Sequence, residues 1–444
     1  MERDSSAGLT RAELDAYWMP FTGNRSFKDA PRMIVGADGC HYIAADGRRV
    51  FDGLSGLWCC GMGHNRREIA IAVTDQIASL DYSPAFQFGH PKAFELANRI
   101  KGMTPGDLDY VFFSNSGSEA TETALKMARA YWFKRGEPEK TKFIGRGKGY
   151  HGVNFGGTSV GGIEPNRAPY GDLMDIAHLP HTLLPENAFT RGLPEHGVEL
   201  ADGLEALVEE HGASSIAAVI VEPMSGSAGV ILPPKGYLER LREICTKHDI
   251  LLIFDEVITG FGRTGHHFGA DTFGVLPDIL CLAKTLTNGT IPMGATVARA
   301  EIYDTFMAEG GADYAIEFPH GYTYSGHPVA CAAALAALEI YESERLTQRG
   351  AELAPHLEAS VHGLKGLPYI TDIRNFGLTA AIQLEPYPGE PARRPIEVAL
   401  ECWEKGLYVR YAGDALALAP HFIAETSDID FACNVLNDVI GTLK

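Results

Sequence analysis

The chain has 444 residues, of which 45% are hydrophobic and 21% charged, and its formal net charge is −19. These values are ordinary for a soluble globular protein with room for more than one domain. The acidic balance argues against a general nucleic-acid binder, because attraction to phosphates needs basic patches.

The eight cysteines form no Cys-x-x-Cys pair and show no zinc-binding spacing, which indicates a reducing compartment. The first residues, Met1 to Ser6, lack the apolar core of a signal peptide. The longest apolar stretch, Val329 to Leu338, is mostly alanine and too short to cross a membrane. We therefore expect a cytoplasmic protein without a membrane or nucleic-acid partner. His178 and His181 have the spacing of some metal ligands, but no third ligand accompanies them, so we expect no metal site.

Residues 32–52 predict a hairpin near the start of the chain. Short apolar runs lie at Met33–Val35, His41–Ile43 and Val50–Phe51. Asp46-Gly47 between apolar stretches is a strong turn signal.

The middle of the chain alternates strand-like and helix-like segments. Continuous apolar runs lie at Tyr110–Phe113, Ile216–Val221 and Ile250–Phe254, and helix-like segments lie at residues 118–135 and 236–248. Such runs separated by helices indicate parallel strands buried on both faces. The sequence therefore predicts an α/β open sheet, whose ligands collect beyond the carboxyl ends of its strands.

The last part of the chain has a different pattern. From about Ala330 onward the sequence predicts a long alanine-rich helix, a region of three strands around Tyr369–Leu384 and Leu407–Ala419, and closing helices. We predict a large central domain and a small α+β domain built from both ends of the chain. The predicted boundaries are 1–65 and 331–444 for the small domain and 66–330 for the large one.

Polar residues follow the predicted strands at their carboxyl ends. Ser114 to Glu119, with Gly117, follows one strand and opens a helix. The N–H groups and dipole at a helix start suit a phosphate, and a glycine allows close approach. The alternative is a capping box with Ser116 as N-cap and Glu119 as its partner, which could coexist with a phosphate.

The segment Gly147 to Gly152 matches Gly-x-Gly-x-x-Gly but lacks the dinucleotide context, because more glycines follow instead of an amphipathic helix. Tyr150 within it could stack on a flat cofactor. The alternative is a tyrosine packed beneath a loop.

Asp255 and Lys284 carry the strongest chemical signal. Asp255 closes an apolar strand, and Lys284 lies in a later stretch of small and apolar residues. Pyridoxal phosphate chemistry needs a lysine for the aldehyde and a carboxylate that keeps the pyridine nitrogen protonated. Asp255 could instead cap a helix or form an ion pair, and Lys284 could be a solvated surface lysine. A desolvated lysine would become a nucleophile near neutral pH.

Arg410 is a cation inside a strand-like run. It could point to water from an edge strand, or its planar guanidinium could grip a substrate carboxylate with two hydrogen bonds.

With these residues, the chain resembles the class III aminotransferases of fold type I from about Trp18 to Ala419. Leu252 to Arg263, Asp278 and Ala283-Lys284 match the signature of that class. The chain is similar more narrowly to the β-alanine (ω-amino acid):pyruvate aminotransferase branch, which includes amine transaminases. The segments that carry this narrower similarity are Tyr17–Phe21, Gly56–Cys59, Glu222-Pro223 and Gly321–Pro328.

The resemblance implies an enzyme that uses pyridoxal phosphate, with an α/β fold of type I: a large domain with a mostly parallel open sheet and a small α+β domain. Lys284 would hold the cofactor covalently and Asp255 would pair with its ring nitrogen. The implied cofactor-binding set is Ser116, Gly117, Ser118, Tyr150, Glu222, Asp255, Val257, Lys284 and, from the neighbouring subunit, Thr323. The implied substrate-binding set is Trp58, Phe86, Phe88, Tyr150, Ala228 and Arg410, with a phenylalanine contributed across the interface.

The same resemblance implies a homodimer with shared active sites, or a dimer of dimers. The small-molecule substrates would be an amine donor and pyruvate, and the products an aldehyde or ketone and alanine. Ornithine, acetylornithine and 4-aminobutyrate aminotransferases have a glutamate that screens the arginine, whereas this chain has Ser227 there. This departure favours a pyruvate user over a 2-oxoglutarate specialist. A 2-oxoglutarate-using aminotransferase, a decarboxylase, a racemase or an aminomutase remain alternatives on the same fold, as does a non-catalytic scaffold.

Overall fold

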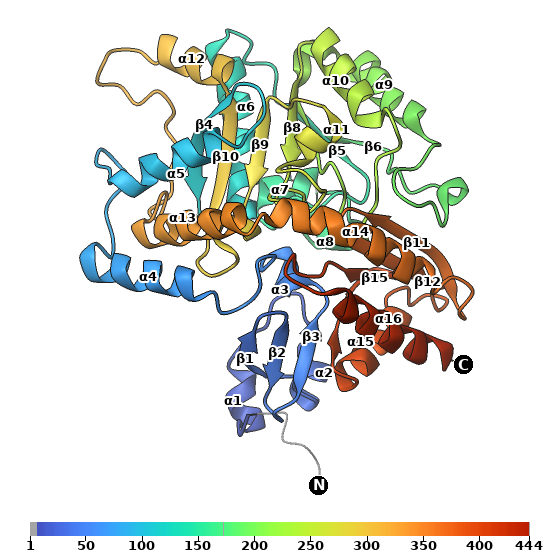
Figure 1. Cartoon of the computed structure of the whole chain (residues 1–444). Coiled ribbons are helices and arrows are strands. Elements are labelled where there is room, and N and C mark those ends of the chain that lie inside the picture. Colours follow the sequence, from blue (N-terminus) through green and yellow to red (C-terminus); the bar gives the residue numbers. More distant parts are fainter. Residues whose placement is uncertain (1–6, 172, 444) are drawn as a thin grey trace.

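The computed structural model describes residues 7–171 and 173–443, and its centre is a seven-stranded sheet (Figure 1). The strands are β4 (Leu108–Ser114), β5 (Lys142–Arg146), β6 (Ile176–Leu179), β7 (Ile216–Val221), β8 (Leu251–Asp255), β9 (Ile279–Leu282) and β10 (Gly294–Arg299). Their order across the sheet is β4-β10-β9-β8-β7-β5-β6. The five strands from β9 to β6 are parallel. They include β7 and β8, the predicted runs Ile216–Val221 and Ile250–Phe254, and confirm a mostly parallel sheet.

β10 is the exception, because it runs antiparallel to both of its neighbours, β4 and β9. The parallel pairing expected for the run Tyr110–Phe113 is therefore wrong, although β4 points in the same direction as the parallel strands. The reason is the short connection between β9 and β10, since a parallel pairing needs a crossover of a dozen or more residues, usually through a helix.

Both faces of the sheet are covered by helices. Ala218 and Ile220 of β7 pack in one apolar cluster with α6 (Gly117–Lys134). Val219 and Val221, which point the other way, join the main cluster with α10 (Tyr237–Lys247) and α13 (Pro328–Ser343). This alternation explains why β7 has no polar residue, because each face of the strand is buried.

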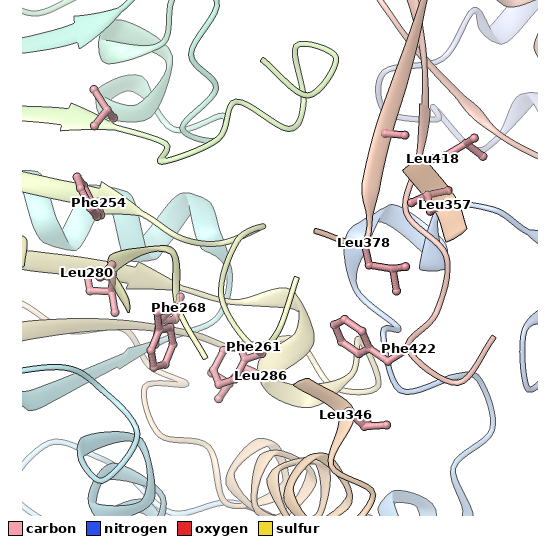
Figure 2. Packing of buried hydrophobic residues seen from close by; sticks show 14 of the residues in the cluster. Phe254, Phe261, Phe268, Leu280, Leu286, Leu346, Leu357, Leu378, Leu418 and Phe422 are labelled. Carbon is pink, nitrogen blue, oxygen red and sulfur yellow. The ribbon is translucent and has the colours of Figure 1, made fainter. Parts of the chain in front are cut away.

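The main apolar cluster continues out of the sheet into the rest of the chain. Figure 2 shows Phe254 and Leu280 of the sheet in the same cluster as Leu378 and Phe422 from the C-terminal part. These side chains are fully or almost fully buried. The C-terminal part therefore shares its core with the large sheet.

A second sheet joins the two ends of the chain. It consists of β1 (Ile34–Asp38), β2 (His41–Ala44), β3 (Arg49–Asp52) and β13 (Leu407–Tyr408), in that order. The turn at Asp46-Gly47 is confirmed, with Gly47 in the left-handed region at φ +83°. The predicted hairpin at residues 32–52 is in fact two consecutive hairpins, and β13 adds to β3 in parallel.

A third, antiparallel sheet has the order β11-β12-β15-β14. Its strands are β11 (Ile370–Phe376), β12 (Thr379–Leu384), β14 (Arg410–Ala412) and β15 (Ala415–Leu418). The expected region of three strands is wrong in its count. The run from Leu407 splits, because Leu407 pairs with Phe51 whereas Arg410 pairs with Ala417 of the third sheet.

The helices predicted at 118–135 and 236–248 and the alanine-rich helix are confirmed as α6, α10 and α13. The remaining helices are α1 (Arg11–Asp15), α2 (Asn24–Asp29), α3 (Ser55–Trp58), α4 (Arg67–Ser79), α5 (Pro91–Lys101), α7 (Phe155–Val160), α8 (Glu164–Arg167), α9 (Gly203–His211), α11 (Gly269–Phe273), α12 (Ala300–Ala308), α14 (Leu346–His362), α15 (Arg393–Glu404) and α16 (Thr426–Gly441). Short 3-10 helices are η1 (Ala168–Tyr170), η2 (Pro185–Asn187), η3 (Val198–Asp202), η4 (Ala213–Ser215) and η5 (Lys284–Thr287). In the described parts of the chain, no helix is both long enough and apolar enough to span a membrane. The domain boundaries near residues 65 and 330 stay a prediction.

Candidate active site

A cavity of about 140 Å³ lies at the carboxyl edge of the seven-stranded sheet. Asp255 is the last residue of β8, Glu222 follows β7, and Lys284 begins η5 just after β9. Because these strands are parallel, their carboxyl ends meet at one edge. The residues that line the cavity are Gly117, Ser118, Tyr150, His151, Gly152, Glu222, Asp255, Val257, Ile258 and Lys284.

Asp255 is held by two hydrogen bonds. Its Oδ1 accepts from the backbone N–H of Val257 at 3.1 Å, and its Oδ2 lies 2.9 Å from Nδ1 of His151. Both Asp255 and His151 are buried, so the imidazole fixes the orientation of the carboxylate inside the cavity. The other ring nitrogen of His151, Nε2, is buried and has no hydrogen-bond partner within the described residues. The sequence reasoning missed His151, because its partner lies far along the chain.

The pKa of the Lys284 ammonium group is lowered from its usual value. Burial lowers its pKa, while Cys59 and the carboxylates of Asp255 and Glu222 oppose that shift and Arg410 adds to it. Its backbone has φ +51°, in the left-handed region that a residue with a side chain seldom adopts. A lysine with a lowered pKa has a larger neutral, nucleophilic fraction near neutral pH.

Glu222 is a buried carboxyl group beside Asp255. Its Oε1 accepts from the N–H of Tyr150 at 2.9 Å and its Oε2 from the N–H of Gly226 at 3.2 Å. Burial raises its pKa to about 7. Glu222 therefore joins the loop that carries Tyr150 to the loop that follows β7.

The start of α6 forms one wall of the cavity. Ser116 is the N-cap, and its Oγ accepts from the N–H of Glu119 at 3.2 Å. The reciprocal half of the predicted capping box is absent here, because Glu119 accepts instead from the N–H of Asn115 at 2.7 Å. The N–H groups of Gly117 and Ser118 have no acceptor within the helix, as at any helix start. They leave a place for an anion at this wall.

Two glycines on this wall have no space for a side chain. A Cβ on Gly117 would lie 2.9 Å from the methyl carbons of Val257. A Cβ on Gly152, which has φ +94°, would lie 2.5 Å from Oγ of Ser118. Ser118 Oγ also accepts from the N–H of Val153 at 3.1 Å, which holds the glycine-rich loop against α6.

Trp58 lies in the core behind the cavity rather than on its lining. It is buried in a cluster with Ile258, which does line the cavity. Asp52 fixes the start of α3, because its carboxylate accepts from the N–H groups of Leu54 at 3.1 Å and Gly56 at 2.6 Å. Trp58 itself has φ +66°, so its place depends on this anchored turn.

Arg410, at the start of β14, is close enough to act electrostatically on the cavity. Its charge lowers the pKa of Tyr150, opposing the larger rise that burial causes. It also lowers the pKa of Lys284. Ala228 lies half-buried in the loop after β7 and does not line the cavity.

Three predicted site residues lie away from the cavity of this single chain. Phe86 is 56% exposed and Phe88 is 71% exposed, and Thr323 is exposed as well. The two segments that carry them are in contact, because the hydroxyl of Tyr82 donates to the carbonyl of Thr323 at 3.1 Å.

The residues present suit pyridoxal phosphate. An amine, a carboxylate with an orienting imidazole, and a helix start with closely packed glycines surround one cavity. Val257 and Tyr150 both line the space in which the ring would lie. These are the groups that this cofactor requires for its aldehyde, its ring nitrogen and its phosphate.

Comparisons with known proteins agree with this chemistry. The sequence profile of the class-III aminotransferases matches residues 22–440. The chain is 56% identical to an omega-amino acid–pyruvate aminotransferase of Pseudomonas putida, over 100% of this chain and 99% of that protein. It is 58% identical to a beta-alanine–pyruvate aminotransferase of Pseudomonas aeruginosa, over 96% of each. Among solved structures, an amine transaminase from an uncultivated Pseudomonas species in its PLP-bound form has a TM-score of 0.89 at 38% identity, covering 96% of this chain and 98% of that one.

Proposed function

This chain belongs to the class III aminotransferases, and we propose that it moves the amino group of an ω-amino acid or amine to pyruvate, giving an aldehyde or ketone and alanine. Members of this family are fold type I enzymes that use pyridoxal phosphate. The observation that carries the proposal is the 56–58% identity, over nearly the whole length, to the two pyruvate aminotransferases. The cavity lined by Lys284 and Asp255 supports the proposal.

Lys284 would hold the cofactor and act as the base. Bound there, pyridoxal phosphate would carry the amino group between substrates and withdraw electrons from the carbon that bears it. The lowered pKa of Lys284 suits both attack on an aldehyde and removal of a proton from the donor carbon.

Asp255 would keep the ring nitrogen protonated, and His151 would orient Asp255. A carboxylate that accepts hydrogen bonds from Val257 and His151 is held in one orientation toward the cavity. The first N–H groups of α6, with Ser116 as the cap and Gly117 and Ser118 in the first turn, would hold the phosphate.

Arg410 would bind the carboxylate of pyruvate. Its guanidinium can form two parallel hydrogen bonds to a planar carboxylate, and it acts electrostatically on Tyr150 and Lys284. Ser227 in the loop after β7 presents no acid to compete for it. Trp58 and Ala228 would shape the space for the amine donor.

We propose that the active form is a homodimer, or a dimer of dimers, with shared sites. The exposed apolar side chains near residues 82–88 and 324 support this proposal, because large apolar groups gathered on a surface favour association. Phe86 or Phe88, together with Thr323, would then reach the cavity of the neighbouring subunit. All eight cysteines are unpaired, which supports a reducing compartment such as the cytoplasm.

The test is a donor panel with the purified protein and pyridoxal phosphate. β-Alanine, 4-aminobutyrate, putrescine and benzylamine are each supplied with pyruvate and then with 2-oxoglutarate, and alanine and glutamate are measured by chromatography. The proposal predicts alanine from pyruvate and little glutamate from 2-oxoglutarate. Release of carbon dioxide, or racemised product without an acceptor, would favour the alternative reactions on this fold.

A further inference from the structure

A buried arginine outside the cavity holds the loop that follows β7. Arg374 lies in β11, and its Nε and Nη2 both donate to the carbonyl oxygen of Gly229, at 3.0 and 2.8 Å. This carbonyl belongs to residues 224–230, which we call the 224–230 loop. Two charged donors on one carbonyl fix the outer end of the loop more firmly than a single neutral bond would.

The other side of the same guanidinium is linked, through Gln383, to the hairpin that begins with Arg410. Its Nη1 donates to Asp372 Oδ2 at 2.5 Å and to Gln383 Oε1 at 2.6 Å. Gln383 in turn donates from Nε2 to Asp414 at 3.1 Å. Asp414 lies in the turn between β14 and β15. Arg374 therefore connects the 224–230 loop to both the core of the third sheet and the turn of the Arg410 hairpin.

The inner end of the 224–230 loop is fixed to the cavity. The N–H of Gly226 donates to Glu222 at 3.2 Å. A Cβ on Gly226 would lie 2.8 Å from Cδ1 of Ile258, and both Glu222 and Ile258 line the cavity. The loop is thus held at Gly226 by the cavity wall and at Gly229 by Arg374.

Between these two attachments the loop faces the Arg410 hairpin at close range. Gly229 has φ +96°, and a Cβ there would lie 3.1 Å from Cβ of Ala415 and 4.0 Å from the carbonyl oxygen of Ala412. Both residues belong to the β14–β15 hairpin. The position of the loop relative to the hairpin that carries Arg410 is therefore held by this packing and by Arg374, in addition to the loop's own backbone bonds between Ser225 and Ile231.

We propose that Arg374 is a positioning residue for the carboxylate subsite: it sets the distance between the 224–230 loop and Arg410. The inference rests on the proposed function, in which Arg410 binds the carboxylate of pyruvate. A loop that moved outward would widen the space beside Arg410 and loosen the grip on a carboxylate. The KM of an acceptor that has no carboxylate would not change, because Arg410 does not bind such an acceptor.

Arg374→Lys is the sharpest substitution. A lysine keeps the positive charge beside Asp372, but its three N–H donors lie on a single nitrogen. It therefore cannot reach Gly229 on one side of the guanidinium site and Asp372 and Gln383 on the other. The matched control is Arg394→Lys. Arg394 is also a buried arginine of the C-terminal part, but its Nε donates to the carbonyl of Glu385 and it has no bond to the loop.

The measurement compares two acceptors, pyruvate and propanal, with one amine donor. Arg374→Lys is expected to raise KM for pyruvate about tenfold, which is the effect of weakening the contact of Arg410 with the pyruvate carboxylate by one charge-assisted hydrogen bond. In Arg374→Lys, KM for propanal, which lacks the carboxylate, should stay within about twofold of the value for the unmodified enzyme. In Arg394→Lys, the KM values for pyruvate and for propanal should both stay within about twofold. A merely structural role would reduce kcat or the active fraction with both acceptors and leave the ratio of the two KM values unchanged.

Gln383→Met provides a second, milder probe that interrupts only the link from Arg374 to Asp414. It should raise KM for pyruvate about threefold and spare propanal. An unchanged ratio in a folded Arg374→Lys protein, or in Gln383→Met if the first variant does not fold, would overturn the inference. An unmodified enzyme that makes no alanine from pyruvate would instead defeat the proposed function, before any variant is compared.

Discussion

Replacing Glu222 by glutamine should change how the stability of the cofactor-free protein depends on pH. Burial raises the pKa of Glu222 from 4.5 to about 7. Between those two pH values the folded protein retains a proton that the unfolded chain has lost, so the free energy of unfolding falls as pH rises. Each pKa unit corresponds to about 1.4 kcal/mol, so the full effect is about 3 kcal/mol.

The Glu222→Gln variant has no carboxyl group at this site and should not show this loss. The carbonyl oxygen of the new amide would still accept from the N–H of Tyr150, but its NH₂ group would face the N–H of Gly226. That mismatch costs about 1–3 kcal/mol, and the cost does not vary with pH. The difference in stability, variant minus unmodified protein, should therefore rise by about 3 kcal/mol between about pH 4.5 and about pH 7.5.

Urea denaturation of both proteins at matched concentration, over a closely spaced series of pH values, measures this difference. Glu256 is also buried and its pKa is raised to about 7. It titrates in both proteins, so its contribution cancels in the difference between their free energies of unfolding. A difference that stays constant over the whole range would refute the argument, because it would mean that Glu222 is not held protonated by burial.

Three further substitutions test the cavity. Lys284→Ala should abolish alanine formation and the cofactor label that borohydride reduction leaves on the peptide containing this lysine; a retained label would contradict the assignment. His151→Phe removes the donor to Asp255 and should lower kcat at least about tenfold, whereas an unchanged kcat would mean that the imidazole does not orient the carboxylate. Gly117→Ala places a methyl group 2.9 Å from Val257 and should raise the Kd for pyridoxal phosphate about tenfold, measured by titrating cofactor-free protein; equal affinity would show that α6 can shift at no cost.

The sequence was most informative where geometry follows from a general rule. Asp255 and Glu222 end or follow continuous apolar strands, and parallel strands bring their carboxyl ends together. That rule was enough to place both carboxyl groups and the start of α6 beside one cavity. Lys284 follows a strand of the same sheet, and the apolar residues around it indicated that its amine would be desolvated.

The features that could not be predicted from the sequence depend on contacts between residues far apart in the chain. His151 lies in a glycine-rich loop without periodicity, and its partner Asp255 is 104 residues away. At Val409 the chain passes from the second sheet to the third. The sequence shows no local sign of this change, because the residues on either side are equally typical of strands. Phe86 and Thr323 lie away from the cavity of the single chain. In the proposed dimer they would reach the cavity of a second copy, which no local pattern can locate.

The parallel pairing of β3 with β13 has a consequence for how the protein is made. Arg48, beside β3, donates to the carbonyl of Trp403 across 355 residues of chain. At about 5–20 residues per second on the ribosome, the first three strands wait roughly 20–70 s for their fourth neighbour to be synthesised. During that interval the edge of β3 would be open to other chains, so we expect nascent or truncated polypeptides that end before residue 407 to depend strongly on chaperones.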